Sequence, residues 1–191
     1  TMISGMSNVG SLEGELNLAA ILLQTLYDGF HPVWNEQRGP HTGKFAAFRT
    51  YAEFVTALKR QLSFEVDNFV VRANDELKKR FTQGNPKLSR TFFTRDCVKR
   101  RKSFEAGGAR YNWAVVCYQG IATMIDSLAA IKKLVFDEKK ISPSDLLAAL
   151  QADFKGYEPI RQQLLAAPKY GNNCREVDLL GKDMIDFVCD E

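Results

Sequence analysis

The sequence of 191 residues lacks several features that would place it in a familiar class at once. It has only two histidines, His31 and His41, and its four cysteines form no C-x-x-C pair, so their spacing fits no zinc module. No apolar run comes near the ~20 residues that a membrane-spanning helix needs, and the N-terminus shows no signal-peptide pattern. We therefore expect reduced thiols, no metal site, no membrane contact and a cytoplasmic location.

A strong excess of charge of either sign is also missing. The 26 basic residues barely outnumber the 23 acidic ones, which is too small an imbalance to indicate nucleic-acid binding. The basic run Lys99-Arg100-Arg101-Lys102 has no aromatic stacking platform or glycine-rich phosphate loop beside it in the sequence. We interpret this run as a solvated helix face, and a helical nucleic-acid binder remains the alternative.

Helices dominate the expected structure, because apolar residues recur at spacings of three and four between capping signals. Thr50 and Glu53 form a capping box ahead of a long apolar stripe, and Ser142 with Pro143 marks another helix start. Helices are expected from Ser11 to Gly29, from Thr50 to Gly84, from Arg95 to Lys102, from Gly120 through Val135, from Ser142 through Leu150, from Pro159 to Ala166 and from Glu176 to the C-terminus.

Only one segment, Tyr111 to Tyr118, has the aromatic and β-branched composition of a strand. Its near-continuous apolarity predicts burial on both faces, and the Gly- and Pro-rich residues 30–49 predict a loop. A buried strand needs neighbours to satisfy its backbone groups. We therefore predict a mainly α chain with very few strands, forming over residues 1–191 a single, incomplete domain.

The most informative stretch begins with the glycine pair of Gly107-Gly108-Ala109-Arg110-Tyr111-Asn112. Gln119-Gly120-Ile121-Ala122 follows, and then Asp126-Ser127-Leu128 within the patterned helix expected from Gly120. In this order and spacing the second half resembles the glycyl radical enzymes, the pyruvate formate-lyase-like family. Further matching motifs are Asp96-Cys97-Val98, FKGYEPIRQQLL at 154–165, APKYGN at 167–172 and, more weakly, Leu16-Asn17-Leu18, Tyr27-Asp28-Gly29, the GPHTG of 39–43 and Phe48-Arg49-Thr50-Tyr51.

The resemblance implies a fragment of a ten-stranded α/β barrel that performs radical chemistry. In this family a separate activating enzyme, with an iron–sulfur cluster and S-adenosylmethionine, installs a glycyl radical. The radical takes hydrogen from a central cysteine, and the resulting thiyl takes hydrogen from a small organic substrate. The expected partners are therefore the remainder of the barrel, the activating enzyme and the substrate, and the parent enzyme is expected to be a homodimer.

Two elements of that chemistry have no counterpart in the sequence. The family's cysteine, in a C-x-E motif, would precede the segment that matches Leu16-Asn17-Leu18, and the glycyl motif would follow Glu191. Cys174-Arg175-Glu176 spells C-x-E but follows the Pro168–Asn173 turn, so we interpret it as a coincidence. We expect no catalytic residue and no cofactor in this chain, and we interpret Cys97 and Cys117 as structural thiols.

The resulting hypothesis is a fragment of a glycyl radical lyase, dehydratase or decarboxylase, inactive alone, so that whether the chain itself is an enzyme stays open. The alternative is a truncated, repurposed helical binding module. Ser4, Ser7 and Asn8, in the loop after the expected cysteine, are the candidate substrate-binding residues. Trp113, Val115, Val116 and Cys117 stand where many relatives read Phe-Thr-Gly-Pro, which disfavours a diol dehydratase or choline lyase and leaves decarboxylases, succinate-adding enzymes and uncharacterised branches open.

Overall fold

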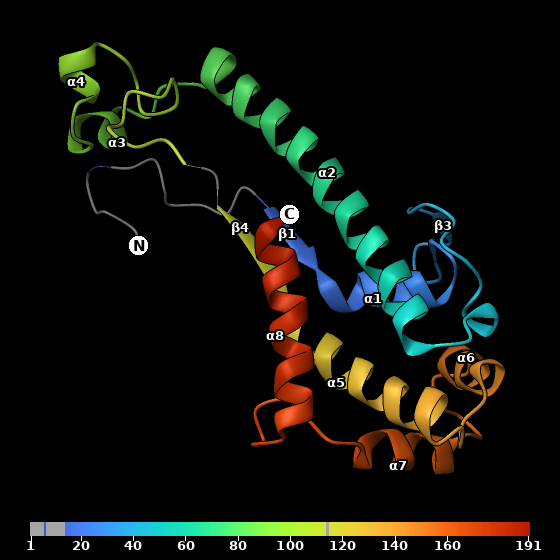
Figure 1. The fold of residues 1–191 in the computed structure, drawn as a ribbon. Helices are drawn as coiled ribbons and strands as arrows, with labels where there is room; N and C mark the ends of the chain where they lie inside the picture. The colour runs from blue at the N-terminus through green and yellow to red at the C-terminus, as the bar shows by residue number, and fades with distance from the viewer. Residues whose placement is uncertain (1–5, 7–13, 114) are drawn as a thin grey trace. The chain divides into compact units, whose positions relative to one another are not determined.

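The computed structural model describes residue 6, residues 14–113 and residues 115–191. These residues are mostly helical with a few short strands, as the sequence predicts (Figure 1). The strands are β1 (Gly14–Asn17), β2 (Phe30–His31), β3 (Glu36–Gln37) and β4 (Val116–Gln119). The helices are α1 (Leu18–Leu26), α2 (Tyr51–Gln83), α3 (Leu88–Phe93), α4 (Cys97–Arg100), α5 (Ile121–Ile131), α6 (Pro143–Gln151), α7 (Glu158–Ala166) and α8 (Arg175–Asp190), with a 3-10 turn at Phe45–Ala47 and a π-helical turn at Lys132–Asp137.

The long helix α2 confirms the prediction made from its capping box. The Thr50 hydroxyl accepts a hydrogen bond from the Glu53 amide at 3.2 Å, and the Glu53 carboxylate accepts one from the Arg49 amide at 2.8 Å. Two backbone donors that a helix start leaves unpaired are thereby satisfied. The start of α6 is confirmed in the same way, because the Ser142 hydroxyl accepts from the Asp145 amide at 3.0 Å.

The strands differ from the prediction. The strand expected over Tyr111–Tyr118 is confined to β4, and its residues Val116 to Tyr118 are half-buried rather than buried on both faces. A two-stranded sheet explains the difference, because β4 pairs with β1, and a second flanking strand is not present among the described residues. The loop expected over residues 30–49 contains the antiparallel pair β2–β3, in which Phe30 faces Gln37.

Two helix boundaries also need correction. The first helix begins at Leu18 and not at Ser11, because Asn17 caps it by accepting from the Ala20 amide at 3.1 Å, and Glu15 lies in β1. The helix expected over Arg95–Lys102 is the single turn α4, bounded by Asp96 and Arg101, both of which have positive φ. Helix α3 was not expected.

The chain forms two compact units. One comprises residues 17–66 and 118–191, and the other residues 1–16 and 67–117. In the first unit, which we call the core unit, α5 packs against α1 and α8 (Figure 1). Phe54 of α2 is fully buried and lies within 5.2 to 6.0 Å, between ring centroids, of Phe45, Phe48 and Phe136. The other fully buried large apolar side chains of this core include Leu18, Leu58, Leu62, Met124, Leu128 and Met184.

The second unit, which we call the loop unit, has a smaller core. It contains the C-terminal half of α2 from Asp67, helices α3 and α4, and the Gly107–Asn112 loop. Its buried apolar residues, among those that the structure describes, are Leu16, Phe69, Ala73, Cys97 and Ala109. A Cβ on Gly14 would lie 2.2 Å from the Phe69 ring, so β1 approaches α2 closely because this position has no side chain.

We predict that Leu128→Ala destabilises the core unit by about 2–5 kcal/mol, because it removes a fully buried side chain and leaves a cavity. Leu165→Ala, at a position that is 55% exposed, should change the free energy of unfolding by less than ~0.5 kcal/mol. Urea titrations followed by circular dichroism measure both values. Equal losses in the two variants would contradict the assignment of this core.

Candidate functional site

The candidate substrate-binding residues Ser4, Ser7 and Asn8 lie outside the described residues, so that assignment stays a prediction. Three features within the described residues bear on function. These are the glycine loop of the loop unit, a buried polar network in the core unit, and an apolar pocket in the core unit.

The Gly107–Asn112 loop is held by hydrogen bonds to its own backbone. The Asn112 side-chain amide donates to the carbonyls of Gly107 and Ala109 at 3.1 and 3.0 Å, and the Arg100 guanidinium donates to the Ala109 carbonyl at 2.7 Å. Arg110 pairs with Asp96 at 2.7 Å. Tyr111 and Asn112 end this motif. Tyr111 is partly exposed, whereas Asn112 stabilises the turn through its side-chain hydrogen bonds.

The two glycines of this loop are needed for different reasons. Gly107 has a φ of +78°, where its absent Cβ would have nothing closer than 3.8 Å, so it supplies a left-handed backbone. A Cβ on Gly108 would lie 2.2 Å from the Lys102 carbonyl oxygen and 2.9 Å from that of Ser103. Gly108 therefore lets two backbone segments approach closely.

This distinction makes a prediction. Gly107→Ala should cost about 1–2 kcal/mol of left-handed strain, whereas Gly108→Ala should cost more than ~3 kcal/mol, because backbone oxygens cannot move aside as a flexible side chain does. Hydrogen exchange of residues 97–112 and urea titration measure the two losses. A larger loss for Gly107→Ala would reverse the assignment.

The four cysteines lie in different environments: Cys97 is buried, Cys117 and Cys174 are half-buried and Cys189 is exposed. Cys97 is fully buried, and burial, together with the charges of Glu105 and Asp96, raises the pKa of its thiol. Cys174, in the C-x-E sequence, precedes α8 and packs against the cluster of Ile125 and Val177. The Glu176 carboxylate accepts from the Lys132 ammonium at 2.7 Å, so it is engaged in a surface ion pair. These positions are consistent with structural thiols.

A buried polar network fastens residues 28–43 to α1 and α2. The side-chain amide of Gln61, which is fully buried, donates to the Pro40 carbonyl at 2.7 Å and to the Thr42 hydroxyl at 3.0 Å, and Gln24 donates to Gln61 at 2.9 Å. Asp28 accepts from the amides of Thr42 and Gly43, each at 2.7 Å. Every one of these groups is satisfied by hydrogen bonds, which is what permits their burial.

The electrostatics of Asp28 follow from these contacts. Burial alone would raise the pKa of this carboxyl group. The hydrogen bonds from the Gly43 amide, the His41 ring and the Thr42 amide outweigh burial and lower the pKa. Asp28 is thus a structural carboxylate that holds the GPHTG segment.

His31 is the unsatisfied member of this region. It is 3% exposed, its Nδ1 accepts from the Trp34 amide at 3.4 Å, and its Nε2 has no hydrogen-bond partner among the described residues. Its ring stacks on Trp34 at 4.0 Å, and the Arg38 guanidinium covers Trp34 at 4.3 Å. Burial, and then the charge of Arg38, lower the pKa of His31, although Glu36 and Glu65 oppose the shift. The net effect favours the neutral form of the imidazole.

A pH dependence of stability follows from the lowered pKa of His31. Because the unfolded chain takes up this proton first, stability is intact above the unfolded pKa of about 6.5 and falls as the pH decreases toward the folded value. For the native chain and for His41→Gln, the urea midpoint should be lower at pH about 5.5 than at pH about 7.5. This decrease should be smaller for His31→Gln. If His31→Gln shows the same change in urea midpoint as the native chain, His31 is not the source of the pH dependence.

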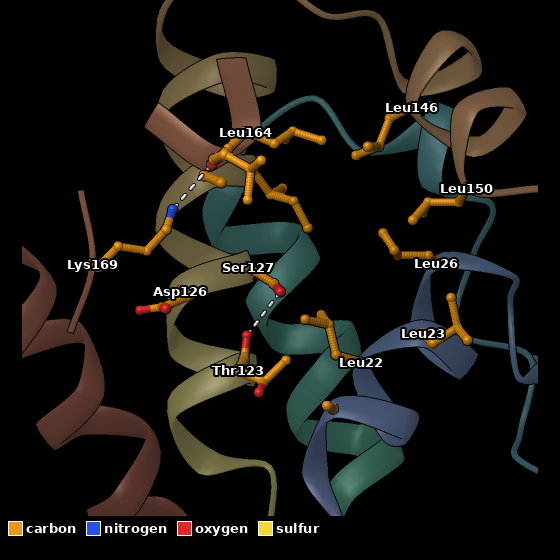
Figure 2. A pocket seen from close by; sticks show the side chains of 14 residues that line it. Leu22, Leu23, Leu26, Thr123, Asp126, Ser127, Leu146, Leu150, Leu164 and Lys169 are labelled. Carbon is orange, nitrogen blue, oxygen red and sulfur yellow. Dashed lines mark hydrogen bonds between the residues drawn. The ribbon is translucent and has the colours of Figure 1, made fainter. Parts of the chain in front are cut away.

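The pocket in the core unit has a volume of about 480 Å³, within the roughly 300–1,000 Å³ typical of ligand pockets. Leucines of α1 and α6 lie across the pocket from Leu164 of α7 and Lys169, and Thr123, Asp126 and Ser127 of α5 also line it (Figure 2). The leucines are Leu22, Leu23, Leu26, Leu146, Leu150, Leu164 and Leu165.

The polar side of this pocket is already occupied by structural hydrogen bonds. Lys169 donates to the carbonyls of Leu164 and Ala167 at 3.0 and 2.9 Å, Ser127 donates to the Thr123 carbonyl at 2.8 Å, and Asp126 accepts from the Tyr170 amide at 2.8 Å. The Lys169 bonds cap the end of α7 (Figure 2), and the Asp126–Tyr170 bond ties the following turn to α5. The polar groups of the lining are thus engaged with backbone atoms, and the remaining lining is mainly apolar.

Among the described residues, no group of three or more His, Cys, Asp or Glu side chains is arranged to hold a metal ion. Within the same residues, no helix is both long enough and apolar enough to span a membrane.

Comparison with known proteins identifies the family. A model of the pyruvate formate lyase-like family matches residues 1–191. Trans-4-hydroxy-L-proline dehydratase of Clostridioides difficile is 35% identical over 181 residues, which are 94% of this chain and 23% of that enzyme. Isethionate sulfite-lyase of Desulfovibrio desulfuricans is 34% identical over 88% of this chain and 21% of that enzyme.

A solved structure agrees with the sequence comparison. The glycerol-bound form of the B12-independent glycerol dehydratase from Clostridium butyricum superposes with a TM-score of 0.83 and 34% identity, over 97% of this chain and 23% of that chain. The chain thus shares the fold of part of a glycerol dehydratase. It belongs to the pyruvate formate lyase-like family of glycyl radical enzymes, and it spans less than a quarter of the length of these relatives.

Proposed function

We propose that residues 1–191 are the central part of a glycyl radical enzyme, a portion of its ten-stranded α/β barrel. The parent enzyme would be a cytoplasmic homodimer that acts on a small organic substrate, without nucleic-acid or membrane contact. The observation that carries this proposal is the family match over the whole chain, together with identities of 34–35% to characterised dehydratases and a sulfite-lyase.

The reaction we propose is elimination with cleavage of a carbon–heteroatom bond. The names of the relatives describe loss of water or of sulfite, and both leaving groups depart from carbon through oxygen or sulfur. Indoleacetate decarboxylase of Tractidigestivibacter scatoligenes is less similar, at 27% identity over 49% of this chain. A decarboxylase or a carbon–carbon lyase is therefore the second choice.

The substrate is proposed to differ from glycerol and from choline. Trp113 to Cys117 replace the Phe-Thr-Gly-Pro segment that is typical of many family members, and Trp113 lies tilted against Tyr111, with ring centroids 5.5 Å apart. A bulky indole in place of a phenyl group changes the volume and the polarity next to the glycine loop. Ser4, Ser7 and Asn8 remain the proposed substrate contacts.

The cofactor belongs to the parent enzyme in this proposal. A glycyl radical, installed by an activating enzyme with an iron–sulfur cluster and S-adenosylmethionine, would supply hydrogen-atom abstraction. The cysteines at 97, 117, 174 and 189 would take no part in it. Cys97 is buried and Cys174 packs against apolar side chains. The contribution of this segment is to build and position part of the barrel wall.

Electron paramagnetic resonance tests the proposal. Under anaerobic conditions, with the activating enzyme and S-adenosylmethionine, a longer polypeptide that contains residues 1–191 with both radical motifs should show a glycyl radical signal, and the 191-residue chain alone should show none. The activated enzyme should then be assayed on a panel of hydroxylated and sulfonated small molecules. Cys174→Ser should leave both signal and turnover unchanged, whereas substitution of the cysteine in the upstream C-x-E motif should abolish turnover and preserve the signal.

Two results would contradict the proposal. A glycyl radical signal from the isolated chain would show that it carries its own radical site. Loss of turnover in Cys174→Ser, with the radical signal intact, would make Cys174-Arg175-Glu176 the catalytic motif after all.

A further inference from the structure

The loop unit presents an unusual surface on α3 and α4, which lie side by side (Figure 1). We call it the α3–α4 surface. It combines exposed apolar side chains with basic ones. Its members are Leu88, Phe92, Phe93 and Val98 together with Lys87, Arg95, Lys99, Arg101 and Lys102.

The apolar part of this surface is highly accessible. Phe93 is 84% exposed, Phe92 67%, Leu88 66% and Val98 58%, and α3 buries none of its six residues. Leu88 and Phe92, four residues apart, share one face of the helix. Single exposed apolar residues are ordinary, but a contiguous group rimmed by charges marks an interaction site.

The charge of this surface is equally concentrated. Residues 86–102 contain seven basic residues and one acidic residue, while the rest of the chain has 19 basic against 22 acidic residues. The single acid, Asp96, is paired with Arg110. The five basic members of the α3–α4 surface form no ion pair with a described residue, and Asp96 offsets their mutual repulsion only in part. A negatively charged partner would remove that cost and gain attraction.

The surface is also fixed in place before any partner arrives. The Lys87 amide donates to Glu105 at 3.0 Å, the Phe104 amide donates to the Thr91 hydroxyl at 3.1 Å, and Arg100 donates to the Ala109 carbonyl at 2.7 Å. These bonds tie both ends of α3 and the end of α4 to residues 104–109. A rigid surface loses little conformational entropy on binding.

The short helices and the mixed side chains of this surface indicate which class of negatively charged partner it fits. A membrane-surface helix needs a long continuous apolar face, whereas α3 has six residues and α4 has four. Single-stranded nucleic acid is bound by stacking on aromatic rings, but two of the four exposed apolar side chains, Leu88 and Val98, are aliphatic. Apolar side chains from a polypeptide would cover all four.

From these observations we infer that the α3–α4 surface docks an acidic segment of a partner protein, one in which carboxylates alternate with large apolar side chains. The carboxylates pair with the free cations, and the apolar side chains cover Leu88, Phe92, Phe93 and Val98. This inference goes beyond the proposed catalytic function and does not depend on it.

Fluorescence anisotropy with a short labelled peptide rich in Glu and Leu tests the inference on the 191-residue chain. Binding should saturate and weaken as the salt concentration rises. Phe92→Ser with Phe93→Ser should weaken it roughly tenfold or more, and Arg95→Glu, Lys99→Glu and Lys102→Glu together should do the same. The matched control is Lys44→Glu, Arg60→Glu and Lys155→Glu, which makes the same change in charge at exposed positions of the core unit and should leave affinity unchanged.

Each variant is checked by circular dichroism, and hydrogen exchange on the complex should show protection within residues 88–102. A peptide with Gln in place of Glu, or with Gly in place of Leu, should bind roughly tenfold more weakly or worse. Absence of binding, equal weakening in the control variant, or protection elsewhere would overturn the inference.

Three further outcomes would also overturn it. Tighter binding of a single-stranded oligonucleotide that displaces the peptide would assign the surface to nucleic acid. Capture by anionic phospholipid vesicles through Phe92 and Phe93, with no peptide binding, would assign it to a membrane. In a longer polypeptide that contains residues 1–191, protection of residues 88–98 with no peptide binding would show that the parent chain itself covers the surface.

Discussion

The core unit depends on the burial of one stripe of α2. Phe54, Leu58 and Leu62 are almost fully buried, and the apolar area that they remove from water is the largest favourable contribution that this helix can make. Gln61, next to that stripe, is equally buried, which is tolerable only because the Pro40 carbonyl and the Thr42 hydroxyl accept its hydrogens. Because burial of the apolar stripe also buries Gln61, residues 40 and 42 must lie against α2 to accept its hydrogen bonds.

The elements that the sequence predicts well are those whose signals are local. The starts of α2 and α6 are set by Thr50 with Glu53 and by Ser142, each acting over three residues. Of the strands, only β4 was predicted, and with too early a start. Its partner β1 was missed, because the two strands pair across about a hundred residues of sequence and the composition of Gly14–Asn17 gives no local indication of a strand. Asn17 was missed as a cap because the apolar spacing of Leu12, Leu16 and Ala19 also fits a helix.

The functional assignment likewise has a part that local sequence motifs predict and a part that depends on the three-dimensional structure. The family could be read from the glycine loop and its neighbouring motifs, and the structure adds why Gly107 and Gly108 are both required. The sequence could not predict which side chains far apart in the chain meet, such as Gln24 with Gln61, or which residues line the pocket. The exposure of Phe92 and Phe93 beside the basic run was missed as well, because periodicity alone cannot tell a packed aromatic side chain from an exposed one.

The pocket and the α3–α4 surface differ in whether their polar side chains already have hydrogen-bond or ion-pair partners. Lys169, Asp126 and Ser127 at the pocket already bond to backbone or are bonded by it, so a ligand there would gain mainly apolar contact. The cations of the α3–α4 surface have no such partners among the described residues. A carboxylate that binds these cations is attracted to them and reduces their mutual repulsion, and few existing hydrogen bonds have to break. By this criterion a partner's binding energy is concentrated on the α3–α4 surface, whereas the pocket contributes mainly to the packing of α1, α5, α6 and α7.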